Sequence, residues 1–278
     1  MIDLKKLETK IVDVFQNQKG LQFAKNVTKF NDLQGDFIAD HINFLIIEEN
    51  DDDAPLIISI VTPFDEVSKK APQQAIIFHN GVVQLSIDFT EYADIRTGIM
   101  DAIVLRRAYK NLGNKKILLV GSGKTARWSI LCMAALAPEV NVISYTNTSV
   151  SDIKLESEVA DKIQLNYMQN PDPKDFDVVI CHTSSKKPIF TIDDLKQMKP
   201  GSFLSYYNKT EIPEQFLVDA SQVIYDWRGN VKDGKDKYYL NDLIGGRSVD
   251  DSGVTVFKSS GTPLQNYAVL KTIYNEKN

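Results

Sequence analysis

The chain has 278 residues, 43% of them hydrophobic and 25% charged, and its formal net charge is −5. Because one domain typically has about 100 to 200 residues, this length predicts two domains with a sizeable buried core. Basic residues are interspersed with acidic ones, which argues against nucleic acid as a partner, and no hydrophobic run reaches the roughly 18 residues that a membrane span needs.

The first part of the chain is predicted to form a helix, a strand and then a β-rich region. The mixed charge of residues 1–16 is that of an amphipathic helix rather than a signal peptide, so a cytoplasmic location is expected. Runs rich in β-branched and aromatic residues fill 36–90 and indicate an antiparallel or mixed sheet. Asn80-Gly81 predicts a hairpin turn, because both residues accept a positive φ. The acidic run 49–53 is interpreted as a solvated loop rather than a metal site.

Later in the chain, helical and strand-like patterns alternate. Residues 97–112 have helical spacing, with Ile99 and Ile103 predicted to face inward. The alternation that follows is typical of a parallel sheet with helices on both faces. We therefore expect an α/β protein with a doubly wound Rossmann-type domain at 113–253. A second, α+β domain for substrate binding and dimerisation is expected at 1–112 together with 254–278, whose last helix is capped by Thr262 with Pro263 in its first position.

Cysteine and histidine usage gives no indication of a metal centre. Cys132 and Cys181 both stand in apolar settings, which suits packing in a reducing compartment better than a disulfide. The chain has 3 histidines, which are scattered and do not form a paired spacing such as His-x-x-x-His. No metal site is expected.

The stretch KKILLVGSGKTARWSILCMAA, from Lys115 to Ala135, contains a glycine turn with two interpretations. A triphosphate-binding loop needs a glycine five residues before Gly-Lys-Thr, but that place is Leu118. A dinucleotide turn needs Gly-x-Gly-x-x-Gly/Ala between a strand and a helix, and Gly121, Gly123 and Ala126 match it. The second interpretation is favoured, although such a turn also occurs where it serves packing alone.

Three segments then stand in a characteristic order: DIRTGIMDAIVLRRA, the turn GSGKTA, and GVTVFKSSGTPLQNYAVL. With CHTSSKKPIF, KTEI and GGR beside them, the chain resembles the ornithine cyclodeaminase and mu-crystallin family, most clearly beyond about residue 80. The resemblance implies a homodimeric two-domain protein that binds NAD or NADP. It further implies hydride transfer on amino acids, imines or oxo acids, or release of ammonia with ring closure.

The resemblance also implies which residues contact the cofactor. They are Arg96 and Thr97, the turn residues Gly121, Ser122, Gly123, Lys124 and Thr125, the strand-end residues Thr183 and Ser184, and Ser260 in the Ser-Ser-Gly turn. An arginine at this place is suited to clamping a phosphate or carboxylate with two parallel hydrogen bonds. A surface or interdomain salt bridge is the alternative for Arg96.

The residues at the expected ribose position depart from the usual pattern. An acidic residue roughly 20 positions after the turn would bind the ribose 2′-hydroxyl of NAD. Asn147 and Thr148 stand there instead, with Ser149 next to them. Loss of the carboxylate removes repulsion of a 2′-phosphate, so NADP is modestly favoured over NAD, although no arginine stands beside Asn147 to bind that phosphate.

The substrate side departs further from the family pattern. Asn208 stands nearest to the place of the family's catalytic aspartate, and it cannot take up a proton. Ile57 falls where the family has a lysine for the substrate carboxylate, and Gln265-Asn266 replaces Gln-Asp. Candidate substitutes are Lys69, Lys70, Lys209 and Glu211, for each of which a solvated charge or a structural ion pair is the alternative.

Three functions therefore remain open. The first is an NAD(P)-dependent enzyme acting on a small amino acid, imine or oxo acid, with Asn208, Lys209 and Glu211 as the catalytic candidates. The second is a protein of the same fold that binds NAD(P)H and has lost the reaction. The third is a scaffold whose glycine turn binds nothing.

Overall fold

The structure is a computed structural model that describes the chain except for residues 1, 32–36, 50–54, 66–71, 148–152, 154, 156–158, 160, 227–237 and 278. The chain divides into two compact units. The first, called the sheet unit below, comprises residues 6–96 and 262–278. The second, called the Rossmann-type unit, comprises residues 1–5 and 97–261.

The sheet unit is built on an antiparallel sheet in which each strand pairs with its neighbour in sequence, in the order β1-β2-β3-β4-β5. Its strands are β1 (Leu21–Asn31), β2 (Phe37–Glu48), β3 (Leu56–Asp65), β4 (Gln74–His79) and β5 (Val82–Asp88). Between β4 and β5, Asn80 and Gly81 have φ values of 53° and 72°. The predicted Asn-Gly hairpin turn is therefore confirmed.

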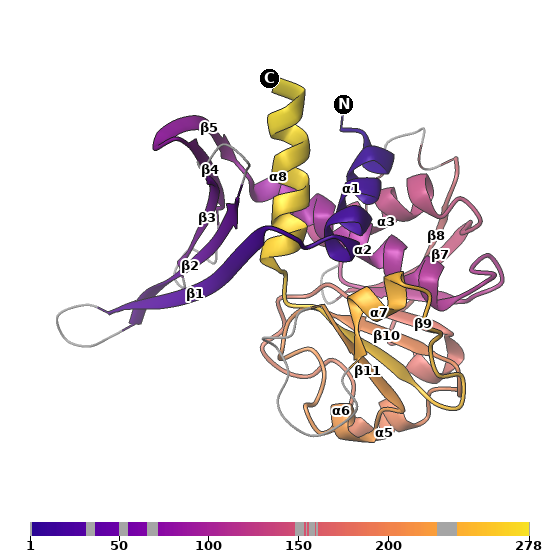
Figure 1. The fold of residues 1–278 in the computed structure, drawn as a ribbon. Helices are drawn as coiled ribbons and strands as arrows, with labels where there is room; N and C mark the ends of the chain where they lie inside the picture. The colour runs from indigo at the N-terminus through magenta and orange to yellow at the C-terminus, as the bar shows by residue number, and fades with distance from the viewer. Residues whose placement is uncertain are drawn as a thin grey trace. The chain divides into compact units, whose positions relative to one another are not determined.

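Two helices complete the sheet unit: α8 (Pro263–Lys277) and most of α1 (Leu4–Gln16). Helix α8 lies along the curved sheet in contact with β1 and β2 (Figure 1). A 2.7 Å ion pair joins Lys271 of α8 to Glu48 of β2. The predicted start of α8 is confirmed, because the Thr262 hydroxyl accepts a hydrogen bond from the Gln265 backbone N–H at 3.3 Å.

Helix α2 (Thr90–Ala108) starts earlier and ends earlier than the predicted 97–112. Asp88, the last residue of β5, contacts the start of α2, because its carboxylate accepts a 2.9 Å hydrogen bond from the Thr90 N–H. Every residue from Ile95 to Leu105 is buried. The helix is therefore packed on all sides over this stretch rather than on one face.

The Rossmann-type unit has a parallel sheet in the order β12-β11-β13-β10-β9-β6-β7-β8. Its strands are β6 (Ile117–Val120), β7 (Val142–Thr146), β8 (Gln164–Tyr167), β9 (Val178–Cys181), β10 (Phe203–Tyr206), β11 (Gln222–Tyr225), β12 (Tyr238–Tyr239) and β13 (Thr255–Lys258). Its helices are α3 (Lys124–Leu136), the 3-10 turn η1 (Pro173–Asp175), α5 (Ile192–Lys196), α6 (Phe216–Asp219) and α7 (Leu240–Ile244).

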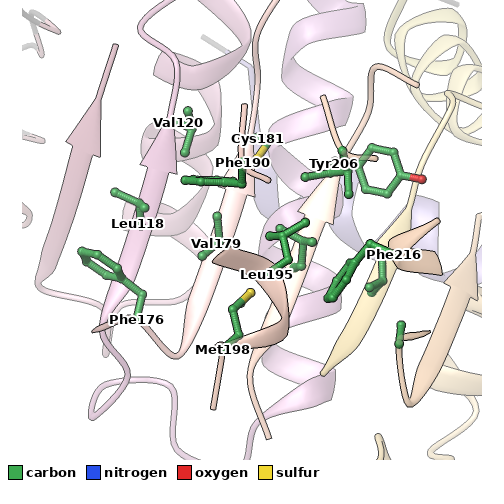
Figure 2. Packing of buried hydrophobic residues seen from close by; sticks show 14 residues of the cluster. Leu118, Val120, Phe176, Val179, Cys181, Phe190, Leu195, Met198, Tyr206 and Phe216 are labelled. Atoms are coloured by element: carbon green, nitrogen blue, oxygen red, sulfur yellow. The ribbon is translucent and has the colours of Figure 1, made fainter. Parts of the chain in front are cut away.

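The central strands of this sheet are buried on both faces, which explains their continuous apolar sequences. All positions of β6, β9 and β10 are buried. Figure 2 shows one face of this core, where Leu118 of β6, Val179 of β9 and Leu195 of α5 belong to one cluster of buried side chains. The predicted α/β fold, with a doubly wound parallel sheet and a second α+β unit, is confirmed.

The described residues contain neither a membrane-spanning helix nor a metal-binding cluster. Within those ranges, no helix combines the length and apolar character that crossing a membrane requires. The same part of the chain holds no group of three or more His, Cys, Asp or Glu side chains that could bind a metal ion.

Candidate functional site

The glycine turn lies at the carboxyl edge of the parallel sheet, where the strands end. It connects β6 to α3, and β6 lies between β7 on one side and β9 on the other. The chain therefore reverses its direction of sheet growth at β6, which makes this a topological switch point. In open α/β sheets, ligands bind in the crevice outside the carboxyl ends of the strands at such a point.

The backbone requires a glycine at position 121, where the end of β6 meets the chain segment that follows β9. Its φ is +124°, and a Cβ added there would lie 2.2 Å from the carbonyl oxygen of His182 on the neighbouring chain segment. The Gly121 N–H donates to the Thr146 carbonyl at 2.8 Å, and the His182 N–H donates to the Val120 carbonyl at 2.8 Å. Gly121 therefore lets the ends of β6, β7 and β9 approach one another closely.

Gly123 has a different role from Gly121. Its φ of −74° is ordinary for any residue, and a Cβ added there would meet no described atom within 4 Å. Gly123 is exposed and forms the N-cap of α3, a helix of 13 residues. An open N-terminus without a side chain at its cap fits a phosphate group, since the helix dipole and free N–H groups favour an anion there.

The other residues predicted to contact the cofactor here lie in the turn, in the first turn of α3 and after β7. Ser122 and Thr125 are half-buried, and Lys124 is exposed as the first residue of α3. Asn147 follows β7 directly and is half-buried. Thr148, like Lys69 and Lys70, lies outside the described residues.

The predicted strand-end residue Thr183 and the predicted catalytic residue Glu211 are in direct contact. One Glu211 oxygen accepts hydrogen bonds from the Thr183 N–H at 2.5 Å and from the Thr183 hydroxyl at 2.9 Å. The other oxygen accepts from the N–H groups of Tyr207 at 3.1 Å and Asn208 at 2.9 Å. Glu211 is fully buried, so its carboxylate holds together the loops after β9 and β10.

Asn208 takes part in the same connection, and Lys209 does not. The Asn208 amide donates to the Ser185 carbonyl at 3.2 Å and accepts from the Thr210 N–H at 3.2 Å. The Thr210 hydroxyl also donates to the Ser185 carbonyl. Lys209 and Ser184 are exposed. The structure thus brings Thr183, Asn208 and Glu211 together and leaves Lys209 at the surface of the same loop.

Ser260 is held by a carboxylate that the sequence analysis missed. Asp226, which follows β11 and is 3% exposed, accepts from the Ser259 hydroxyl at 2.6 Å and from the Ser260 N–H at 2.8 Å. Asp226 directly follows β11, which pairs with β13 in the same parallel sheet, so its position at a strand end was a possible indication of a site residue. Its distance in sequence from Ser259 and Ser260 meant that no local motif linked the three residues.

Arg96 and Thr97 fall on either side of the boundary between the two units. In the sheet unit, the buried Arg96 guanidinium donates to the side-chain oxygen of Gln265 at 2.7 Å. Asn266, next to Gln265, is 0% exposed, and its side-chain nitrogen and oxygen have no hydrogen-bond partner among the described residues. In the Rossmann-type unit, Thr97 is buried and its carbonyl accepts a 3.4 Å hydrogen bond from the Tyr207 hydroxyl.

Glu211 gives a pH-dependent prediction. Burial raises the pKa of the Glu211 carboxyl, and hydrogen bonds from Asn208, Thr183 and Tyr207 offset part of the rise. The folded chain therefore holds this proton more tightly than the unfolded chain, so the carboxyl stabilises the fold at low pH and loses that contribution as pH rises through the raised pKa. Glu211→Gln should reduce the free energy of unfolding by about 2 kcal/mol, because its NH₂ would face backbone donors.

The deficit of Glu211→Gln relative to the wild type should narrow as the pH is raised from about 4 to about 8. Urea denaturation at several pH values measures this difference. Glu214→Gln, which makes the same change at an exposed position three residues along, is the control and should show little effect. A deficit that widens with pH would contradict the assignment.

Comparison with known proteins agrees with this geometry. A family model described as shikimate / quinate 5-dehydrogenase matches residues 104–206, which contain the glycine turn and the loop ends around it. No curated protein matches the chain.

Solved structures match over nearly the full length. The Thermococcus litoralis Δ1-pyrroline-2-carboxylate reductase in complex with NADH and L-proline is 14% identical, with a TM-score of 0.79 over 99% of this chain and 93% of that one. The iminosuccinate reductase of Paracoccus denitrificans in complex with NAD⁺ is 15% identical, with a TM-score of 0.74 over 99% and 92%. A probable ornithine cyclodeaminase from Bordetella pertussis is 14% identical, with a TM-score of 0.73 over 98% and 90%. The fold that the predicted resemblance to the ornithine cyclodeaminase and mu-crystallin family implies is thus confirmed, since these structures match 98–99% of this chain.

Proposed function

We propose that this chain binds NAD(H) or NADP(H) and catalyses hydride transfer on an amino acid, imine or oxo acid. One observation carries the proposal. At the switch point of a parallel sheet, a first glycine is demanded by the backbone and a second stands open at the N-terminus of a long helix. A dinucleotide site needs both glycines, because the first makes the tight turn and the second lets the pyrophosphate approach the backbone.

The residues for the cofactor are those gathered at the carboxyl edge. The backbone of Gly121 to Thr125 would hold the pyrophosphate, with Lys124 beside it as a cation, and Asn147 would face the adenosine ribose. Thr183 and Ser260 would border the nicotinamide half, each held in place by a buried carboxylate. The nicotinamide, when bound, would supply or accept the hydride.

For the substrate side, the solved structures suggest a class rather than a molecule. The Thermococcus litoralis protein is seen with L-proline, and the Paracoccus denitrificans protein reduces iminosuccinate by its name. We propose that Arg96 binds the carboxylate of such a substrate or a cofactor phosphate. Lys209 is the proposed proton donor or acceptor, because the four hydrogen bonds to Glu211 leave that carboxylate with a positioning role.

Cofactor binding without turnover is the second candidate. Asn208, Ile57 and Asn266 replace the ionisable groups that the resemblance implies, and the two Asn208 side-chain contacts fix loops rather than a ligand. A panel of amino, imino and oxo acids, assayed by the absorbance of NADH and NADPH, separates the two. Turnover of any of them supports the enzyme, and tight cofactor binding without turnover across the panel supports the second candidate.

The first test is a fluorescence titration of the purified chain with NADH and then NADPH. We expect a Kd in the micromolar range or below for at least one of them. The ratio of the two Kd values tests the modest preference for NADP that Asn147 predicts. Absence of binding to either would overturn the proposal. Because the archaeal alanine dehydrogenase of this fold is described as a dimer with bound NAD, we also propose a homodimer, which light scattering checks.

A further inference from the structure

A buried polar cluster lies under the carboxyl edge of the Rossmann-type unit, with the carboxylate of Asp101 at its centre. One Asp101 oxygen accepts a 2.6 Å hydrogen bond from Ser129 and lies 2.7 Å from Nε2 of His182. The other accepts from the hydroxyls of Tyr207 at 3.2 Å and Ser205 at 3.4 Å. The side chains of Asp101 and His182 are 0% and 1% exposed.

This one carboxylate joins four elements of the unit. Asp101 belongs to α2, Ser129 to α3 and Ser205 to β10, while His182 and Tyr207 directly follow β9 and β10. Burying a carboxylate is unfavourable unless donors compensate it, and apolar packing would join the same elements without that cost. The cluster is therefore expected to specify an arrangement rather than to add stability.

The arrangement it specifies includes the dinucleotide turn. His182 is the residue whose carbonyl faces Gly121, so its backbone position decides how closely β6 and β9 approach. The next residue, Thr183, is the one that Glu211 holds. The contact with Asp101 ties the His182 side chain to α2, next to the backbone that faces Gly121 and precedes Thr183.

Tyr207 extends the cluster toward the surface. The centroid of its half-buried ring lies 4.9 Å from that of the His182 ring, at an interplanar angle of 36°. It also makes an edge contact with Phe257, at a centroid distance of 6.5 Å. Its hydroxyl is directed inward, to Asp101 and to the carbonyl of Thr97. Asp101 therefore fixes both side chains that follow the two central strands.

We propose that Asp101 is a positioning residue for the dinucleotide site, acting through His182 and Tyr207 on the ends of β9 and β10. The inference rests on the proposed function, since it is the cofactor whose binding the arrangement serves. The side chain of Asp101 is itself fully buried. It holds the edge in the shape that the cofactor would meet.

The sheet offers a matched pair of tyrosines for the test. Tyr109 and Tyr207 are both half-buried, and each hydroxyl lies within hydrogen-bond distance of two acceptor oxygens. Each ring also makes an edge contact with a phenylalanine, at ring-centroid distances of 6.4 Å and 6.5 Å. Tyr109 bonds the carbonyls of Asp177 and Gly201, at the opposite end of the strands. Tyr207→Phe and Tyr109→Phe thus remove equivalent groups at the two ends of the same sheet.

We expect Tyr207→Phe to raise the Kd for NADH about tenfold in a fluorescence titration, and Tyr109→Phe to leave it within about twofold. Both variants should stay folded in urea denaturation, with a somewhat larger loss of stability for Tyr207→Phe, because its hydroxyl donates to a carboxylate whereas that of Tyr109 donates to carbonyls. Asp101→Asn should raise the Kd at least as much as Tyr207→Phe. If Asp101→Asn fails to fold, Ser129→Ala takes its place in the test. This variant removes one donor to Asp101 and should raise the Kd for NADH by a smaller factor.

A spectroscopic readout distinguishes positioning from simple loss of stability. The chain has 3 histidines, so the imidazole signals of His182, whose Nε2 lies 2.7 Å from Asp101, can be assigned by NMR. In the wild type these signals should shift when NADH is added, and in Tyr207→Phe the shift should shrink.

Equal Kd values for the wild type, Tyr207→Phe and Asp101→Asn would overturn this inference alone. So would an NADH-insensitive His182 signal in a wild type that binds NADH. A wild type that binds neither NADH nor NADPH would overturn the proposed function together with this inference.

Discussion

Replacing Gly121 with alanine will destabilise the chain by about 3 kcal/mol or more, because strain and overlap add at one position. Its φ of +124° is a conformation that L-residues rarely adopt, and the new Cβ would lie 2.2 Å from the carbonyl oxygen of His182. That oxygen belongs to backbone held in the sheet, since the His182 N–H donates to Val120 at 2.8 Å. Urea denaturation measures the loss.

Two other glycines separate the causes of this loss. Gly81→Ala tests the positive φ alone, because its φ is +72° and a Cβ there meets nothing within 4 Å. It should cost about 1 kcal/mol. Gly123→Ala tests neither and should cost about 1 kcal/mol at most, because alanine is a poorer N-cap than glycine. If Gly121→Ala costs no more than Gly81→Ala, the backbone at His182 yields easily and Gly121 is not demanded by the crossing.

Local sequence patterns were sufficient for much of the fold. The Asn80-Gly81 turn was predictable because two positive φ values in succession need residues that accept them, and both values are observed. The alternation of strands and helices predicted the parallel sheet. Its strands could be recognised because strands buried on both faces have continuous apolar sequences, such as Ile117 to Val120. In each case the physical cause acts within a few residues of the chain.

Helix α2 shows where local patterns are insufficient. The inward positions Ile99 and Ile103 were predictable from helical spacing and are buried. However, the helix is buried on all sides between Ile95 and Leu105, and a polar residue on such a helix looks exposed by its periodicity. Asp101 was overlooked for this reason, and its partners Ser129 and His182 lie 28 and 81 residues away.

The candidate site shows the same limit. Lys209 and Glu211 looked equivalent in sequence as acid or base candidates. In the structure one is exposed, whereas the other accepts four hydrogen bonds, three of them from backbone N–H groups. Backbone donors have no signature in the sequence, because every residue except proline carries one. The role of an acidic side chain in a loop is thus decided by how the loop folds.

Replacing Gly123 with valine will raise the Kd for NADH by at least about 100-fold, equivalent to 2.7 kcal/mol, while the chain stays folded. With φ −74° and ψ −174°, Gly123 has an extended backbone that valine adopts readily, and its Cβ would meet no described atom within 4 Å. Valine is a poorer N-cap than glycine, which costs about 1 kcal/mol at most. The cofactor loses far more, because the side chain would stand where the pyrophosphate approaches the N-terminus of α3.

Fluorescence titration with NADH and urea denaturation of the same preparation check both halves of this expectation. Gly123→Ala should give an intermediate Kd, since a methyl group blocks less of the approach than an isopropyl group. Lys124→Ala, next to it, should weaken binding through charge alone and more at low salt than at high salt. Valine at position 123 with unchanged NADH affinity would show that the dinucleotide does not approach this glycine, and the observation that carries the proposed function would be lost.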